Sequence, residues 1–203
     1  MKRIACNHCQ RPLPVCLCAA LPPQAIDNHW PVYILQHRQE LDHALNTARI
    51  AALGLVQCQV HIVSDTRVED TLPIEVLAEL DKALLIYPGP ESRAVAELDT
   101  QEVVARPLVL LDASWRKSRR MLLSSPWLQA LPRMSFNLQT PSRYRIRKEP
   151  APNYCSTLEA LCVVLGTLEQ NQHKYAPLLA TMDVMIDQQI ERMGDATFRR
   201  NYH

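Results

Sequence analysis

The stretch Asp112-Ala113-Ser114-Trp115 places a carboxylate, a hydroxyl and an indole where an apolar run gives way to a basic one. The apolar residues 107–111 predict a buried strand, and the basic residues 116–120 that follow predict a helix. A carboxylate at the end of a buried strand can act as a general base or bind a polar ligand. It can equally cap the next helix by accepting hydrogen bonds from backbone N–H groups. Both interpretations of Asp112 are open from the sequence.

The two polar neighbours of this carboxylate have alternatives of the same kind. The Ser114 hydroxyl can bond a ligand or the base, or it can cap the helix. The Trp115 indole can stack on an adenine or on a target base, or it can fill the core. We take Asp112, Ser114 and Trp115 as the candidate catalytic residues.

Four cysteines lie close together near the start of the sequence, in the pattern Cys6-x-x-Cys9 and Cys16-x-Cys18. Four thiolates suit tetrahedral zinc, whose binding can fold a segment that is too small to fold alone. An iron–sulfur cluster, a redox pair and unliganded thiols are the alternatives, and zinc is the interpretation that we favour. We expect a zinc-binding knuckle over residues 1–24 and a catalytic domain over residues 25–203.

The segments around these motifs alternate between strands and helices, which predicts an α/β fold with a mostly parallel sheet. The expected strands cover residues 32–36, 59–63, 83–87, 107–111 and 134–137. The expected helices cover residues 41–53, with Gly54 as C-cap, and 74–80, 92–98, 114–123, 156–170 and 175–193. Ligands bind at the carboxyl ends of strands in such sheets, so we expect the loops 87–92, 112–115 and 149–157 to meet.

Basic residues are concentrated in one part of the sequence. Residues 112–148 contain nine Lys or Arg and one acid, whereas the whole chain has 22 basic and 21 acidic residues. Interleaved aromatic residues make a nucleic acid the expected polyanion, because bases stack on aromatic faces. The N-terminal residues show no apolar leader, and no apolar run is long enough to cross a bilayer. We therefore expect a cytoplasmic protein with no membrane partner.

Five motifs that occur in order, together with the four cysteines, resemble the DTW-domain family over essentially the whole chain. The family's Asp-x-Thr-Trp signature corresponds to Asp112-Ala113-Ser114-Trp115, with serine in place of threonine. The other motifs are Gln36-His37-Arg38-Gln39-Glu40, with Arg38 where proline is usual, Asn46-Thr47-Ala48-Arg49, Tyr87-Pro88 and Ser156-Thr157-Leu158-Glu159-Ala160.

The resemblance implies a fold related to the knotted SPOUT methyltransferases and a tRNA-uridine aminocarboxypropyltransferase activity. Such an enzyme transfers the 3-amino-3-carboxypropyl group of S-adenosylmethionine to N3 of a uridine in tRNA and releases methylthioadenosine. The partners it implies are tRNA and Zn²⁺, with no obligate protein partner, although a homodimer is compatible with the sequence. The alternatives are a SPOUT-like RNA methyltransferase that uses S-adenosylmethionine and a non-enzymatic tRNA-binding zinc protein.

The resemblance implies where the donor would bind, and the basic segment indicates which residues would bind the RNA. The expected donor-binding residues are Tyr87, Pro88, Leu111, Asp112, Ser156, Thr157 and Glu159. Ser156, Thr157 and Glu159 also form a capping-box pattern, and that structural role is sufficient by itself. The expected RNA-binding residues are Arg116, Lys117, Arg120, Arg143, Arg145 and Arg147. Alternation at 143, 145 and 147 predicts an extended strand that tracks phosphates or, alternatively, a charged edge strand that resists aggregation.

Overall fold

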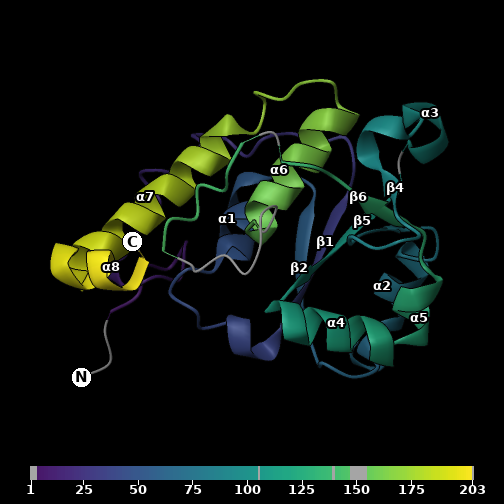
Figure 1. Cartoon of the computed structure of the whole chain (residues 1–203), viewed down its shortest axis with the longest axis horizontal. Helices are drawn as coiled ribbons and strands as arrows, with labels where there is room; N and C mark the ends of the chain where they lie inside the picture. The colour runs from purple at the N-terminus through teal and green to yellow at the C-terminus, as the bar shows by residue number, and fades with distance from the viewer. Residues whose placement is uncertain (1–3, 105, 139, 147–154, 203) are drawn as a thin grey trace.

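The computed structural model describes residues 4–104, 106–138, 140–146 and 155–202. Its six strands form one parallel sheet in the order β2-β1-β5-β3-β6-β4 (Figure 1). The strands are β1 (Val32–His37), β2 (Cys58–Val63), β3 (Leu84–Ile86), β4 (Arg93–Ala94), β5 (Leu108–Asp112) and β6 (Arg133–Ser135). The α/β class with a mostly parallel sheet is therefore confirmed, and the knot that the SPOUT resemblance implies stays a prediction.

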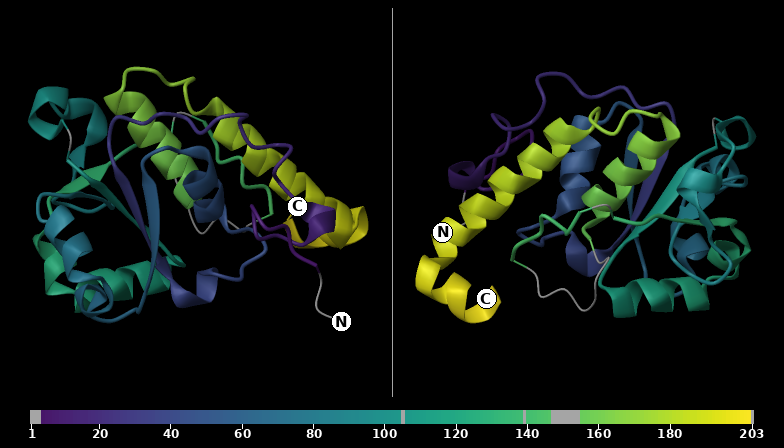
Figure 2. Two further views of the ribbon diagram at one scale, coloured as in Figure 1. Left: turned by 180° about the vertical axis from the view of Figure 1, so that it is seen from behind. Right: turned by 45° about the horizontal axis from the view of Figure 1, so that its top comes forward.

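Helices cover both faces of this sheet (Figures 1 and 2). They are α1 (Thr47–Gly54), α2 (Ile74–Glu79), α3 (Thr100–Val103), α4 (Trp115–Ser124), α5 (Pro126–Ala130), α6 (Thr157–Leu168), α7 (Ala176–Met193) and α8 (Asp195–Tyr202). Alternate strand residues enter different cores, as the pleat requires. Val32 and Ile34 pack in the core that includes α1, α6 and α7 residues, whereas Tyr33 and Leu35 pack in the core that includes α4 and α5 residues. Burial on both faces explains why β3 and the first residues of β1 and β5 are continuous apolar runs.

The helix expected over residues 41–53 begins six residues later than predicted. Leu41 is 41% exposed and follows a short 3-10 turn, Arg38–Glu40, so the apolar spacing that starts at Leu41 does not mark a buried face. The side chain of Asn46 instead caps α1 by accepting a hydrogen bond from the Arg49 N–H at 3.1 Å. Gly54 is the last residue of α1 and not its cap. A Cβ there would lie 2.3 Å from Leu178 Cδ2, so glycine lets α1 approach α7 closely.

The helix expected over residues 92–98 is also wrong in type. The chain forms the short edge strand β4 and then a 3-10 turn, Val95–Glu97, because Val95 turns into the core. In the part of the chain that the structure describes, no helix combines the length and apolar character needed to cross a membrane.

The N-terminal segment packs against the end of the molecule that carries α7. Leu17 belongs to the same core cluster as Leu178, and the Thr181 hydroxyl donates to the Ala20 carbonyl at 2.6 Å. Both views in Figure 2 show this segment close to the C-terminal helices. The N-terminal segment and the rest of the chain share apolar contacts. Their division into a knuckle and a catalytic domain stays a prediction.

Candidate active site and metal centre

A cavity of about 1090 Å³ lies at the carboxyl ends of β3 and β5. Each of the three loops expected to meet contributes to its wall. Tyr87, Pro88, Gly89 and Ser92 come from the first loop, Asp112–Trp115 from the second and residues 155–157 from the third. Residues 149–154 of the third loop lie outside the described residues. Leu111 and Lys117 also line the cavity, so it gathers most of the residues to which the sequence assigns chemistry.

Asp112 is the last residue of β5, and its carboxylate is held from two sides. The Thr157 hydroxyl donates to Oδ1 at 2.5 Å, and Gln36 Nε2 donates to Oδ2 at 2.6 Å. The N-cap position of α4 belongs to Ser114, whose side chain makes no capping hydrogen bond. The capping interpretation of Ser114 is therefore wrong, whereas that of Asp112 stays a prediction. The Asp112 carboxylate lies at the cavity wall.

Gln36 and Asn46 form a buried pair behind this carboxylate. Gln36 is 2% exposed, and its Nε2 also donates to Asn46 Oδ1 at 3.1 Å. The Asn46 side chain thus has two roles. It caps α1, and it positions the Gln36 amide that donates to Asp112. Both residues lie in motifs of the sequence, but the motifs alone predict no role for either side chain. The available signal was a glutamine in an otherwise apolar strand, since buried polar side chains are uncommon and need partners.

Two aromatic side chains stand beside Asp112. The Tyr87 and Trp115 rings meet edge to face, with centroids 6.0 Å apart and planes at 61°. Trp115 is half-buried, lines the cavity and belongs to neither of the apolar clusters among the described residues. The position of Trp115 therefore does not support a role in the core. Its stacking on an adenine or on a target base stays a prediction.

The N-terminus of α6 forms another part of the wall and has the predicted capping box. Ser156 Oγ accepts from the Glu159 N–H at 3.2 Å, and the Glu159 carboxylate accepts from the Ser156 N–H at 2.8 Å. Glu159 is buried behind the wall, where its other oxygen accepts from the Arg143 N–H at 2.7 Å. Its position favours a role in holding residues 142–146 against α6 over direct contact with a donor.

The expected RNA-binding residues are divided between two parts of the surface. On α4, Arg116 is exposed, Lys117 lies 3.6 Å from Glu40, and Arg120 lies 3.3 Å from Asp65. Arg143 and Arg145 instead pair with α7, at 2.8 Å from Asp183 and 2.6 Å from Asp187. These ion pairs and the hold of Glu159 on Arg143 draw residues 143–146 into bends and turns, so the extended strand predicted there is wrong. Arg147 lies outside the described residues.

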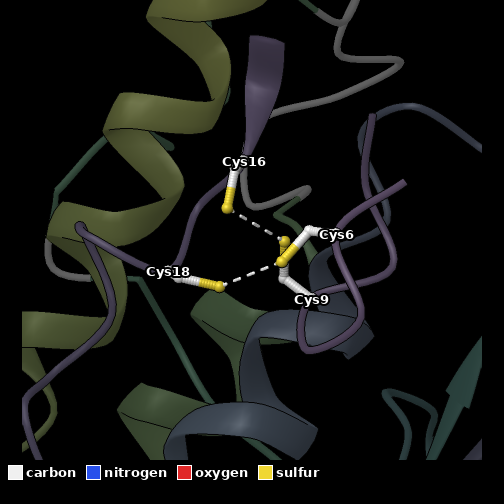
Figure 3. A group of neighbouring side chains, drawn as sticks. All are labelled: Cys6, Cys9, Cys16 and Cys18. Carbon is white, nitrogen blue, oxygen red and sulfur yellow. Dashed lines mark hydrogen bonds between the residues drawn. The ribbon is translucent and has the colours of Figure 1, made fainter. Parts of the chain in front are cut away.

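The four cysteines form one cluster at the N-terminal end of the chain (Figure 3). Their Sγ atoms all lie within 4.8 Å of one another, with Cys6 and Cys18 at 3.6 Å and Cys9 and Cys16 at 3.7 Å. Tetrahedral zinc with Zn–S bonds of about 2.3 Å places its sulfurs about 3.8 Å apart. Backbone hydrogen bonds from Cys9 and then His8 lower the pKa of the Cys6 thiol to about 6, whereas hydrogen bonding with Cys16 and then burial raise the pKa of the Cys18 thiol to about 12. The donor set fits a four-coordinate metal ion.

Arg11 links this cluster to the cavity. Its guanidinium is buried, and it donates to the Val15 carbonyl inside the knuckle at 2.8 Å and to the Ala44 carbonyl at 2.5 Å. Ala44 lines the cavity in the loop that precedes Asn46. A folded knuckle therefore helps to position one wall of the candidate active site.

The comparisons with known proteins agree with this arrangement. The model of the DTW domain matches residues 3–190. The chain belongs to the DTW-domain family. Its Asp-x-x-Trp signature, at residues 112–115, lies on the cavity wall, and Ser114 of that signature faces the cavity where threonine is usual.

Several curated relatives of this DTW domain carry the name tRNA-uridine aminocarboxypropyltransferase 2. The Drosophila melanogaster protein is 29% identical over 195 residues, which cover 94% of this chain and 76% of the relative. The Macaca fascicularis protein is 27% identical over 194 residues, covering 94% of this chain and 65% of the relative. The Mus musculus protein is 26% identical over 205 residues, covering 99% of this chain and 68% of the relative. This chain thus spans less than two thirds of the macaque protein, and no solved structure matches it at a significant level.

Asn46→Ala is expected to lower both the stability of the DTW domain and its affinity for S-adenosylmethionine, the expected donor. Loss of a helix cap costs about 1 kcal/mol, which lowers Tm by about 2–4 °C in a chain of this size. The substitution also frees Gln36, so donor affinity should fall several-fold in calorimetry. Asp99→Ala is the matched control, because Asp99 caps α3 by accepting from the Gln101 N–H and does not line the cavity. Equal donor affinity in the two variants would show that Asn46 is a cap alone.

Proposed function

We propose that this chain transfers the 3-amino-3-carboxypropyl group of S-adenosylmethionine to N3 of a uridine in tRNA and releases methylthioadenosine. The observation that carries the proposal is the Asp112 carboxylate, fixed by Thr157 and Gln36 at the wall of a large cavity beside Tyr87 and Trp115. Membership of the DTW-domain family and the names of the curated relatives support the same activity. Chemical activity requires a donor site, a base and an RNA surface, and the structure offers a candidate for each.

The strand-end side of the cavity suits a sulfonium donor. Aromatic faces attract cations, and Tyr87 and Trp115 stand beside the carboxylate that would complement the sulfonium charge. The α6 N-terminus at residues 155–157 offers backbone N–H groups and the positive end of a helix dipole to the donor's carboxylate. Pro88 and Leu111 supply apolar contact on the same side, and the Ser114 hydroxyl is available to bond the donor.

Asp112 is the proposed general base. The lone pair of N3 attacks the carbon that joins the aminocarboxypropyl group to sulfur. The bond between that carbon and sulfur breaks, and its electron pair stays on the sulfur of methylthioadenosine. The N3 proton moves to Asp112, because uridine is a poor nucleophile until it loses that proton. Each Asp112 oxygen already accepts one hydrogen bond and retains further acceptor capacity. Holding the acceptor in line with the breaking bond supplies much of the rate enhancement in such displacements.

Basic residues near the cavity are the proposed contacts for tRNA. Arg116, Lys117 and Arg120 follow the signature on α4, and Lys117 lines the cavity itself. Arg143 and Arg145 are half-exposed candidates whose charges are partly offset by their partners on α7. Phosphate contacts of this kind give affinity that falls with salt and carries little sequence information.

Zn²⁺ is the metal that we propose for Cys6, Cys9, Cys16 and Cys18. Four cysteine ligands close the coordination shell, so the ion would stabilise the knuckle without taking part in chemistry. Reduced thiols are favoured in the cytoplasm, which is where we propose that the protein works.

Mass spectrometry of tRNA nucleosides from a strain that lacks this chain tests the proposed function. We expect the loss of a uridine that is heavier by one aminocarboxypropyl group. Loss of a methylated base instead would identify an RNA methyltransferase. Absence of any heat when the purified chain is titrated with S-adenosylmethionine would indicate a tRNA-binding protein without this donor.

A further inference from the structure

The C-terminal helix α8 lies beyond the residues that the DTW-domain model matches, yet it reaches the candidate active site. Helix α7 ends at Gly194, which has a φ of 80° and allows the chain to change direction. A Cβ at this position would meet nothing within 4 Å, so the glycine is required for its backbone conformation and not for close packing. Figure 1 shows α8 turned away from the axis of α7. This turn brings Tyr202 to the cavity wall.

Three side chains from α7 and α8 form a wall that is separate from the strand ends. Gln189, Met193 and Tyr202 line the cavity, whereas Asp112, Tyr87 and Thr157 come from β5, the end of β3 and α6. The Gln189 amide and the Tyr202 hydroxyl make no hydrogen bond with another residue in the described ranges. The Tyr202 ring packs against Phe198, with centroids 5.8 Å apart and planes at 32°. A polar amide and a supported aromatic ring facing one cavity are the groups that bind an unstacked base.

The cavity is slightly larger than the usual range for a single ligand. Cavities for one ligand of drug size usually measure about 300–1,000 Å³, and this one measures about 1090 Å³. The proposed donor contacts all lie on the side formed by the strand ends and α6. An acceptor base must enter the same cavity to reach the donor carbon, and it must leave the stack to do so.

The exposed surface of α8 carries two arginines and one acid, Asp195. Arg199 and Arg200 are both exposed, and neither has an acidic partner among the residues that the structure describes. On the neighbouring helix α7 the situation is the opposite, since Asp183 and Asp187 pair with Arg143 and Arg145. The α8 arginines are thus the better placed of the two pairs to bind phosphates.

We infer that the α7–α8 wall is the acceptor-base subsite of this enzyme. Tyr202 stacks on the target base, Gln189 donates a hydrogen bond to a base oxygen, and Arg199 and Arg200 bind phosphates that flank the displaced nucleotide. This inference rests on the proposed function, because it takes tRNA as the acceptor and S-adenosylmethionine as the donor.

Separate measurement of tRNA and donor affinity tests the subsite. The native chain is compared with Tyr202→Ala, Tyr202→Phe, Gln189→Ala and the double variant Arg199→Ala/Arg200→Ala. Affinity for tRNA is measured by fluorescence anisotropy over a series of salt concentrations, and donor affinity is measured by calorimetry on the same preparations. Lys82→Ala is the control for loss of charge, because Lys82 is an exposed cation before β3, at the opposite end of that strand from the cavity.

Tyr202→Ala should weaken tRNA binding about tenfold, which is within the range found for loss of one base-stacking ring. Tyr202→Phe keeps the ring and should stay close to the native affinity, and Gln189→Ala should weaken tRNA binding several-fold. The double arginine variant should lower the slope of log affinity against log salt by about 1.5, and Lys82→Ala should leave it unchanged. Donor affinity should stay within about twofold of native in each variant.

The inference is overturned if Tyr202→Ala weakens donor binding instead, or if every variant binds tRNA as the native chain does. If the native chain still binds and modifies tRNA in that experiment, only the proposed subsite is wrong and the proposed function stands. A native chain that binds no tRNA would contradict the proposed function itself, and the subsite with it.

Discussion

Asp112→Asn is expected to lower the rate of transfer by about 10²-fold or more, whereas donor affinity should fall only several-fold through loss of the charge that complements the sulfonium. The asparagine has the same shape, and its Oδ1 can still accept from Gln36 Nε2. The Thr157 hydroxyl can rotate to accept from the new amide, so the site should keep its geometry. The amide cannot take the N3 proton, and loss of a general base typically lowers the rate by about 10²–10⁴-fold.

Single-turnover assays with saturating donor and tRNA measure this effect without interference from binding. Thr157→Val is the companion variant, since it removes one hydrogen bond to Asp112 and leaves the carboxylate. It should reduce the rate much less than Asp112→Asn does. A normal rate in Asp112→Asn, with unchanged Tm, would show that Asp112 only organises the end of β5.

Cys9→Ser is expected to remove the metal and to release the N-terminal segment from the rest of the fold. Cys9 is the fully buried member of the cluster, and a serine hydroxyl is a much poorer ligand for zinc than a thiolate. Structural zinc supplies about 10–16 kcal/mol to small zinc-finger peptides, so the knuckle should not hold its shape without the ion. The sheet should remain folded, because both of its apolar cores consist mainly of residues outside the knuckle.

Metal content and hydrogen exchange measure this effect together. The native chain should contain one zinc ion, show no iron–sulfur absorption and protect the backbone of residues 4–24. Cys9→Ser should lose the metal and that protection, and donor affinity should fall several-fold because Arg11 no longer holds Ala44. Cys58→Ser is the control: burial raises the pKa of the Cys58 thiol to about 12, so it stays protonated and should not bind the ion. Full metal content in Cys9→Ser, or iron in the native chain, would contradict the zinc assignment.

The sequence predicts those parts of the fold whose signals are local. Strands β1 and β5 begin as apolar runs, β2 alternates polar and apolar residues, and α6 begins with a capping box, so the sequence predicts each within one or two residues. Helix α1 was misjudged because Leu41 fits the apolar spacing but stays exposed. Helix α8 has no buried residue, and among its described residues only Phe198 and Tyr202 pack against the core, so its position depends on the turn at Gly194.

The candidate site also has parts that the sequence predicts and parts that it does not. The sequence brings Asp112, Tyr87 and Thr157 to one end of a parallel sheet, because the carboxyl ends of its strands share an edge. It could not show that Gln36 holds Asp112, since that contact joins residues 76 positions apart. The pairing of Arg143 and Arg145 with α7 spans about 40 positions, so alternation alone suggested a strand that does not form. Contacts between distant segments decide which polar residues serve the site and which serve the fold.

The co-product of the purified chain is the most direct test of the proposed reaction. The protein is incubated with S-adenosylmethionine and unmodified tRNA, and the nucleosides released from the donor are separated and quantified. We predict methylthioadenosine in equal amount to the newly modified uridine, because the C–S bond to the aminocarboxypropyl group is the one that breaks. Formation of S-adenosylhomocysteine with a methylated base would contradict the proposed reaction.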